Sequence, residues 1–173
     1  MNIHYELTEE DYINFNLYHI KHSKMGKRSL LLQRIVSPLM FIIVAYLYAM
    51  IGNLPFLPLF ITFGIVSIIW IIYYPKYFYG LIARNAKKMI KEGKNDDLLG
   101  NHQLILTEEG LVDTTANKET KVTWSGITII QEDDGYIFLY NSSVSAYILP
   151  KRELDHVDEV RQYIQSKGIV SEE

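Results

Sequence analysis

The longest hydrophobic stretch, residues 35–74, contains no Asp, Glu, Lys, Arg or His. Its 40 residues are about twice the roughly 20 that cross a bilayer as a helix. A Gly-Asn-Leu-Pro turn at residues 52–55 divides it, because Gly and Asn tolerate positive φ and Pro cannot continue a helix. The pattern predicts a transmembrane hairpin with spans at residues 35–51 and 56–74. A buried hairpin in a soluble core is disfavoured, since the remaining chain is too short to cover two fully apolar helices.

Positive charges on both flanks of the predicted hairpin indicate its orientation. The turn between the spans has no Lys or Arg, whereas the two flanks contain Lys21, Lys24, Lys27, Arg28, Arg34, Lys76, Arg84, Lys87, Lys88, Lys91 and Lys94. The positive-inside rule places such flanks in the cytoplasm. We therefore expect a multi-pass protein of the plasma (cell) membrane whose two termini are cytoplasmic.

From residue 102 the hydrophobic pattern changes from a helical period to a period of two, which is typical of strands. Strands are predicted at residues 102–107, 111–115, 119–124, 127–132, 136–141 and 146–149. Asp134-Gly135 is the strongest hairpin signal between them. Pro150 ends the last strand, and an amphipathic helix follows at residues 151–166, with an apolar face that should cover the sheet.

The N-terminal segment begins with the same alternation. Residues 2–7 place Ile3, Tyr5 and Leu7 on one side and predict a short strand. Thr8-Glu9-Glu10-Asp11 then resembles a capping box and predicts a helix that runs to about residue 23. Six residues cannot form a sheet alone. We therefore predict that this strand joins the C-terminal sheet.

No combination of residues in the sequence indicates a particular reaction. The chain has no cysteine, which excludes disulfides and thiolate chemistry. His19 and His22 lie three residues apart on a predicted helix and could share a metal ion, but a metal site needs at least a third ligand, and Asp11 is two turns away. Polar helix residues near lipid headgroups are the favoured interpretation, so we expect no metal and no other cofactor.

Two acidic clusters have similarly ordinary explanations. Asp155, His156, Asp158 and Glu159 resemble an acid–base cluster, but acids at the start of a helix also stabilise its dipole. Residues 132–134, Glu-Asp-Asp, are interpreted as a solvated turn. The sequence therefore gives no catalytic, cofactor-binding or metal-binding residue, and we expect a protein without enzymatic activity.

The remaining candidates favour packing over ligand binding. Trp124 should face the core, although stacking on a ligand is the alternative. Gly64 and Ser67 are small residues that could lie at a helix contact. Residues 101–173 contain thirteen Asp and Glu against six Lys and Arg, and the β-rich stretch 102–149 has only two of these basic residues, Lys118 and Lys121. This acidity argues against binding nucleic acid or inositol phosphates.

Several short motifs follow the predicted hairpin in a fixed order. They are Leu-Thr-Glu-Glu-Gly-Leu at residues 106–111, Trp-Ser-Gly-Ile at 124–127, Tyr-Ile-Phe-Leu-Tyr at 136–140 and Ala-Tyr-Ile-Leu-Pro-Lys-Arg at 146–152. With the opening at residues 5–12, they make the chain resemble the YcxB-like family of bacterial membrane proteins. Gly126 and Leu154 depart from the family's usual charged and aromatic residues. The resemblance implies a pleckstrin-homology-like C-terminal domain, a small bent antiparallel sheet capped by a C-terminal helix, and it supplies no catalytic residues.

These patterns divide the chain into four regions. Residues 1–34 form an N-terminal strand and amphipathic helix, 35–75 the transmembrane hairpin, 76–100 a basic juxtamembrane helix and linker, and 101–173 a cytoplasmic YcxB-like domain. The fold class is thus a membrane α-helical hairpin plus an α+β domain.

The expected function is a membrane-anchored, non-enzymatic interaction module. Its partners would be the lipid bilayer and a protein or a second copy of the chain, with no nucleic acid and no small-molecule substrate. The alternative is an accessory subunit of a membrane transporter or of an envelope-stress or resistance complex, acting through its hairpin.

Overall fold

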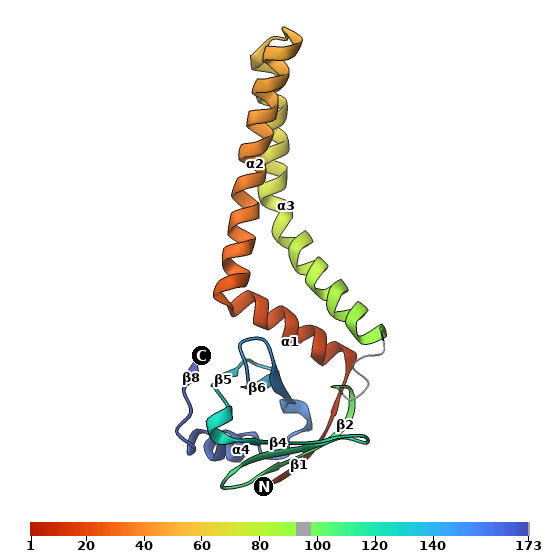
Figure 1. Ribbon diagram of the computed structural model, residues 1–173, viewed down its shortest axis with the longest axis vertical. Coiled ribbons are helices and arrows are strands. Elements are labelled where there is room, and N and C mark those ends of the chain that lie inside the picture. Colours follow the sequence, from red (N-terminus) through yellow and green to blue (C-terminus); the bar gives the residue numbers. More distant parts are fainter. Residues whose placement is uncertain (93–97, 173) are drawn as a thin grey trace. The chain divides into compact units, whose positions relative to one another are not determined.

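The structure, a computed structural model, describes residues 1–92 and 98–172 and contains two compact units (Figure 1). One unit combines Met1–Phe15 with Ala86–Glu173, and the other is Asn16–Asn85. The two ends of the chain therefore build one unit, and the segment between them builds the other.

The two longest helices are α2 (Lys24–Gly52) and α3 (Phe56–Lys91). Both are long and apolar enough to cross a membrane. Large apolar side chains along them, such as Leu39, Ile43, Ile65 and Ile72, are exposed. A helix that is apolar all round and exposed is typical of a membrane span.

Polar caps fix both ends of α2. The Gly26 N–H donates to the Ser23 hydroxyl oxygen at 3.0 Å, so α2 begins well before the first apolar residue of the predicted span. At the other end, Asn53 adopts a left-handed conformation with φ 48° and its N–H donates to the Ala49 carbonyl. Asn is one of the few residues that accept this conformation without large strain. The predicted turn therefore lies where the sequence placed it.

The helix α3 does not end at Pro75, and the predicted division between residues 75 and 76 falls inside it. Pro75 has no N–H to donate to the carbonyl of Ile71, four residues earlier. The Nε–H of Arg34, on α2, donates to that carbonyl instead, at 2.9 Å. In Figure 1 α3 changes direction where its colour passes from yellow to green. A neighbouring donor thus lets the helix continue through a proline as a bend.

The buried residues of the apolar part of α2 are small or compact: Pro38, Ala45 and Ala49. On α3, Ser67 is also buried, and its hydroxyl donates to the Phe63 carbonyl at 2.8 Å. Small residues allow helix backbones to approach, as the sequence predicted for Ser67. Gly64 differs, because a Cβ added there would meet nothing within 4 Å.

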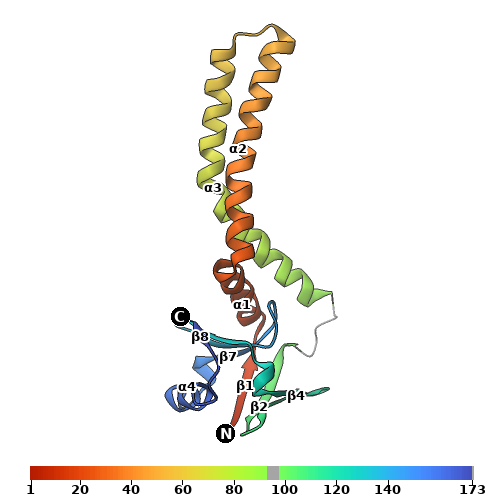
Figure 2. The same cartoon turned by 60° about the vertical axis from the view of Figure 1, so that its left-hand side comes forward.

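The first sheet has the order β1-β2-β3-β4, with every pair antiparallel. Its strands are β1 (Asn2–Leu7), β2 (Gly100–Leu106), β3 (Gly110–Thr114) and β4 (Glu119–Thr123). Figure 2 shows β1 beside β2, and Ile3 pairs with Leu104 in their register. The prediction that the N-terminal strand joins the C-terminal sheet is confirmed.

The second sheet has the order β7-β6-β5-β8. Its strands are β5 (Ile129–Glu132), β6 (Tyr136–Tyr140), β7 (Ala146–Pro150) and β8 (Ser171–Glu172), and β8 lies parallel to β5. The resemblance implied one bent sheet, whereas the structure has two. The reason is the 3-10 turn η2 (Trp124–Gly126), which follows β4 directly, so β4 and β5 do not pair as a hairpin.

The C-terminal helix α4 (Val157–Gln165) is shorter than predicted. Residues Lys151–Glu153 form a separate 3-10 turn, η3, in which the Leu154 N–H donates to the Lys151 carbonyl at 3.1 Å. Val160 and Ile164 of α4 are buried in the core with Phe138 and Leu149. The predicted fold class, two long apolar helices followed by antiparallel sheets and a C-terminal helix, is confirmed.

The helix α1 (Glu9–His22) begins in the unit that combines Met1–Phe15 with Ala86–Glu173, which we call the β-domain. The ring centroid of Phe15 lies 5.5 Å from that of Phe138 and 5.8 Å from that of Tyr140. Phe15 and Phe138 are both buried. The start of α1 is therefore part of the same hydrophobic core as the C-terminal strands.

Candidate functional site

The carboxylate of Asp11 accepts five hydrogen bonds from three residues of the same unit. Both terminal nitrogens of the Arg152 guanidinium, on η3, donate to the Asp11 carboxylate, at 2.6 and 2.7 Å. The Tyr136 hydroxyl donates at 2.8 Å, and the Thr8 backbone N–H and hydroxyl donate at 2.8 and 2.7 Å. The capping box expected from the sequence is present, since the Asp11 N–H in turn donates to the Thr8 hydroxyl at 3.3 Å.

These hydrogen bonds determine the charge state of Asp11. Its side chain is only 1% exposed. Burial alone would raise the pKa of this carboxyl group, but the hydrogen bonds from Arg152 and Thr8 outweigh burial and hold the pKa well below its ordinary value. Thr8 and Asp11 precede the hairpin, while Tyr136 and Arg152 follow it. The buried ion pair therefore fastens the N-terminal segment to the C-terminal domain.

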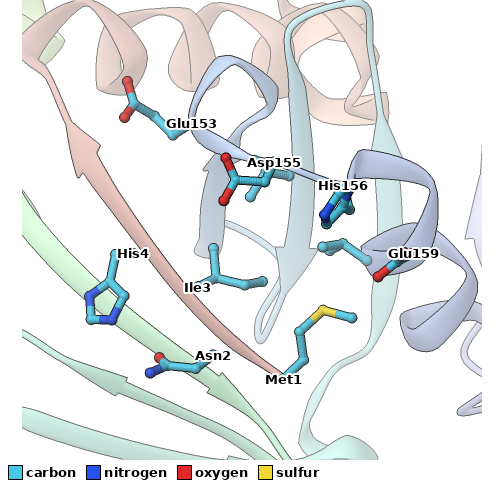
Figure 3. A pocket seen from close by; sticks show the side chains of 10 residues that line it. Met1, Asn2, Ile3, His4, Glu153, Asp155, His156 and Glu159 are labelled. Atoms are coloured by element: carbon cyan, nitrogen blue, oxygen red, sulfur yellow. The ribbon is translucent and has the colours of Figure 1, made fainter.

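A cavity of about 210 Å³ lies between β1 and the segment from η3 to α4, and Figure 3 shows it from close by. Its apolar lining comes from Met1, Ile3, Leu154 and Val160. Its polar lining comes from Asn2, His4, Glu153, Asp155, His156 and Glu159. In Figure 3, His4 and Asn2 project from the opposite side of β1 to Ile3 and Met1. The pocket thus combines an apolar floor with an acidic rim.

The carboxylates at the rim of this pocket would attract a cation, and its apolar floor would contact an apolar group. Ile3, Leu154 and Val160 are buried, so they form a fixed floor. Three carboxylates line the rim, although Glu153 already interacts with Arg152, whose Nε lies 3.2 Å from it. A ligand that carries a positive group beside an apolar one has the complementary pattern.

The structure brings only part of the predicted acid–base cluster together. Asp155, His156 and Glu159 line the pocket. Asp158 does not, because its carboxylate accepts a hydrogen bond from Arg161 on the same helix. His156 is the N-cap residue of α4 but makes no side-chain capping hydrogen bond.

The acidic run at residues 132–134 is not simply a solvated turn, as the sequence indicated. Arg161 and Lys151 both form ion pairs with Glu132, at 2.6 and 2.7 Å. The hydrogen bond from Arg161 lowers the pKa of Glu132. Asp133 does serve the turn, since it accepts from the N–H of Gly135 at 2.9 Å. The sequence did not show the ion pairs because Arg161 lies 29 residues away.

The side chain of His22 on α1 has partners within its own helix. The Nδ1 atom of His22 lies 2.8 Å from the Tyr18 carbonyl, and the two rings stack with centroids 4.0 Å apart. Burial lowers the pKa of His19. Among the side chains of residues 1–92 and 98–170, no group of three or more His, Asp or Glu could hold a metal ion. The absence of a bound metal stays a prediction.

Trp124 is buried, as predicted. Its Nε1–H donates to the Thr107 carbonyl at 2.9 Å, and its ring meets the edge of Tyr163 with centroids 6.3 Å apart. The hydrogen bond joins η2 to the end of β2. Trp124 is therefore positioned as a core residue at the point where the chain leaves the first sheet.

A buried polar group that the sequence did not reveal lies inside the first sheet. The Nδ1 atom of His102 lies 3.1 Å from Asp113, and the ring of Tyr5 stacks on that of His102 with centroids 5.1 Å apart. His102 is buried, and its Nε2 has no hydrogen-bond partner among the described residues. Burial and the nearby Asp113 raise the pKa of Tyr5. The strand register, which brings residues 5, 102 and 113 together, was the missing information.

These observations define a class of protein, one with two apolar helices of membrane-spanning length and an acidic β-domain built from both ends of the chain. Residues 106–164 match the YcxB-like protein family, so the segment from the end of β2 to α4 is a YcxB-like domain. The resemblance stated from the sequence is confirmed for this segment. Comparisons with curated proteins and with solved structures found no match.

Proposed function

We propose that this protein is a non-enzymatic interaction module, held by its transmembrane hairpin at the inner face of a bacterial plasma membrane. In this proposal the β-domain and both termini are cytoplasmic, and the short turn at residues 52–55 is external. The domain would recruit a protein partner to the membrane surface.

The pairing of β1 with β2 is the observation that carries the proposal. Because β1 precedes the hairpin and β2 follows it, both ends of the hairpin return to one folded unit. Such a unit lies wholly on one side of a membrane, and the positive-inside rule favours the cytoplasmic side. The Lys and Arg residues flank the apolar run on this side alone.

The pocket between β1 and α4 supports protein binding as the role of the domain. Its buried floor of Ile3, Leu154 and Val160 suits an apolar side chain, and the carboxylates of Asp155 and Glu159 suit a neighbouring Lys or Arg. The expected partner segment is therefore basic and partly apolar. A phosphate or nucleic acid would be repelled by the same rim.

Affinity purification of the intact protein from crosslinked membranes tests this proposal. The double variant Asp155→Asn with Glu159→Gln removes two charges from the pocket. Asp158→Asn is the matched control, because it removes a charge from the same helix at a position outside the pocket. We expect the double variant to lose a partner that the wild type and the control retain.

Two results would contradict the proposal. If every partner persists in the double variant, the pocket is not the docking surface. If the co-purifying proteins instead depend on lipid-facing residues of the hairpin, such as Ile43 and Ile65, the chain is an accessory subunit of a membrane complex, which is the alternative function.

A further inference from the structure

Pro75 leaves one carbonyl of α3 without its usual partner. In an α-helix the N–H of a residue donates to the carbonyl four residues earlier, and proline has no N–H. The carbonyl of Ile71 is therefore free to accept from elsewhere. Leaving a backbone carbonyl unpaired near a hydrocarbon phase is unfavourable, so a replacement donor is strongly favoured.

Arg34 supplies this donor, and the hydrogen bond fixes the position of its side chain. Its Nε–H donates to the Ile71 carbonyl at 2.9 Å. The neighbouring residue Gln33 also joins α2 to α3. Its backbone carbonyl lies 3.5 Å from Trp70 Nε1, and its side-chain amide oxygen accepts from the Tyr74 hydroxyl. Tethering through Nε leaves the two terminal nitrogens of the guanidinium for another ligand.

The position of Arg34 along the hairpin corresponds to the lipid headgroups. Arg34 lies 17 residues before Ile51, which is about 26 Å of helix. Pro75 lies 19 residues after Phe56, which is about 29 Å. The hydrocarbon core of a bilayer is about 30 Å thick. Both residues therefore lie at the same polar boundary, where lipid phosphates are found.

Two further cations follow on the same helices, Lys27 on α2 and Arg84 on α3, whose Nε–H donates to the Gly80 carbonyl at 3.2 Å. Lys27 precedes Arg34 by two helical turns and so shares its face of α2. On α3, the Tyr77 ring lies 6.2 Å from that of Tyr74, and the Arg84 guanidinium lies 5.8 Å from the Tyr77 ring. No carboxylate of residues 1–92 or 98–170 pairs with Arg34, Lys27 or Arg84.

We propose that Arg34, fixed by the Pro75 bend, is the centre of a binding site for the phosphate of an anionic phospholipid, with Lys27 on α2 and Arg84 on α3 as further cations. The inference rests on the proposed membrane location and adds a specific lipid to it. Arg suits this role because its planar guanidinium donates two parallel hydrogen bonds to a phosphate. Tyr77 provides a ring surface beside the lipid chain.

Native mass spectrometry of the intact protein tests the site directly. The protein is released from micelles that contain equimolar phosphatidylglycerol and phosphatidylcholine, and the ratio of the two lipid-bound forms is measured. We expect Arg34→Gln to lower the phosphatidylglycerol preference about tenfold, because the phosphate of phosphatidylcholine is already neutralised by its choline and gains less from the guanidinium. Arg28→Gln is the matched control, because it removes the same charge from another face of α2, and it should change the ratio little.

Two further variants separate a built site from diffuse attraction. Arg34→Lys keeps the charge but cannot make both the tether and a bidentate contact, so it should also lower the preference. Pro75→Ala restores an N–H to the Ile71 carbonyl and should lower the preference by releasing Arg34. Excess inorganic phosphate should leave lipid binding unchanged, because the ligand includes the acyl chains.

The site is refuted if Arg34→Gln and Arg28→Gln reduce the preference equally, since the basic flanks then act only as a diffuse charge. It is also refuted if Arg34→Lys behaves as wild type, or if free phosphate displaces the lipid. Alkaline extraction of membranes checks the underlying proposal separately. A wild-type protein that is extracted would show that the membrane location itself is wrong.

Discussion

The buried carboxylate of Asp11 allows the sharpest test of how the two ends of the chain are joined. We consider Asp11→Asn, which keeps the shape of the side chain and removes its charge. The wild-type carboxylate accepts five hydrogen bonds, from Thr8, Tyr136 and Arg152. Arg152 contacts both carboxylate oxygens, so in either orientation the new amide NH₂ would face a guanidinium N–H.

The expected cost follows from burial. Removing one partner of a buried ion pair costs about 3 to 5 kcal/mol. Asp11 is 1% exposed, but the Arg152 side chain is 47% exposed, so water can rehydrate the cation that remains. We therefore expect the lower end, about 3 kcal/mol of unfolding free energy. The loss should fall on the β-domain unit, because all three hydrogen-bond donors belong to it.

Urea unfolding of the intact protein in detergent micelles measures this cost. Trp70 and Trp124 are the two tryptophans, so a Trp70→Phe background makes Trp124 fluorescence report on the β-domain alone. Asp11→Asn should lower the midpoint by about 1 M or more. The control Asp158→Asn, at an exposed carboxylate, should leave the midpoint essentially unchanged.

The pH dependence gives a second, independent readout. The pKa of Asp11 is lowered in the folded protein, so its contribution is complete above the unfolded pKa of about 3.9 and is lost as pH falls through the folded pKa. The stability difference between wild type and Asp11→Asn should be constant from about pH 5 to 7 and shrink below about pH 4. A cost below about 1 kcal/mol, or a difference that does not change with acid, would refute the ion pair as the fastening.

Three further predictions concern packing, topology and register. Trp124→Ala should destabilise the β-domain by about 3 to 5 kcal/mol as a core deletion, and an unchanged melting temperature together with a lost binding activity would identify Trp124 as a site residue instead. In intact cells an impermeant thiol reagent should label Asn53→Cys and not His4→Cys, and the reverse labelling would overturn the orientation. Mild oxidation should crosslink His4→Cys with Gln103→Cys, which are register partners, and not with Leu104→Cys, whose side chain faces the core.

Local patterns determined the elements that depend on neighbouring residues. The uncharged run at residues 35–74 specified two apolar helices because it is about twice as long as one bilayer-spanning helix and a Gly-Asn-Leu-Pro turn divides it. The alternation at residues 2–7 predicted both ends of β1 correctly. Because a single strand needs a neighbouring strand for its backbone hydrogen bonds, the sequence also predicted which sheet it joins. The capping box at Thr8 and Asp11 followed from side-chain reach over three residues.

Only the tertiary structure could decide features that join residues distant in sequence. Arg34 reaches a carbonyl on the neighbouring helix, and this lets α3 continue through Pro75, where local propensity predicts an end. Arg152 pairs with Asp11, which lies 141 residues earlier in the sequence. The register of β1, β2 and β3 brings the buried His102 within hydrogen-bonding distance of Asp113. Each depends on a hydrogen-bonding group that chain folding brings into range. Sequence periodicity records which face is apolar, but it does not record which polar groups meet.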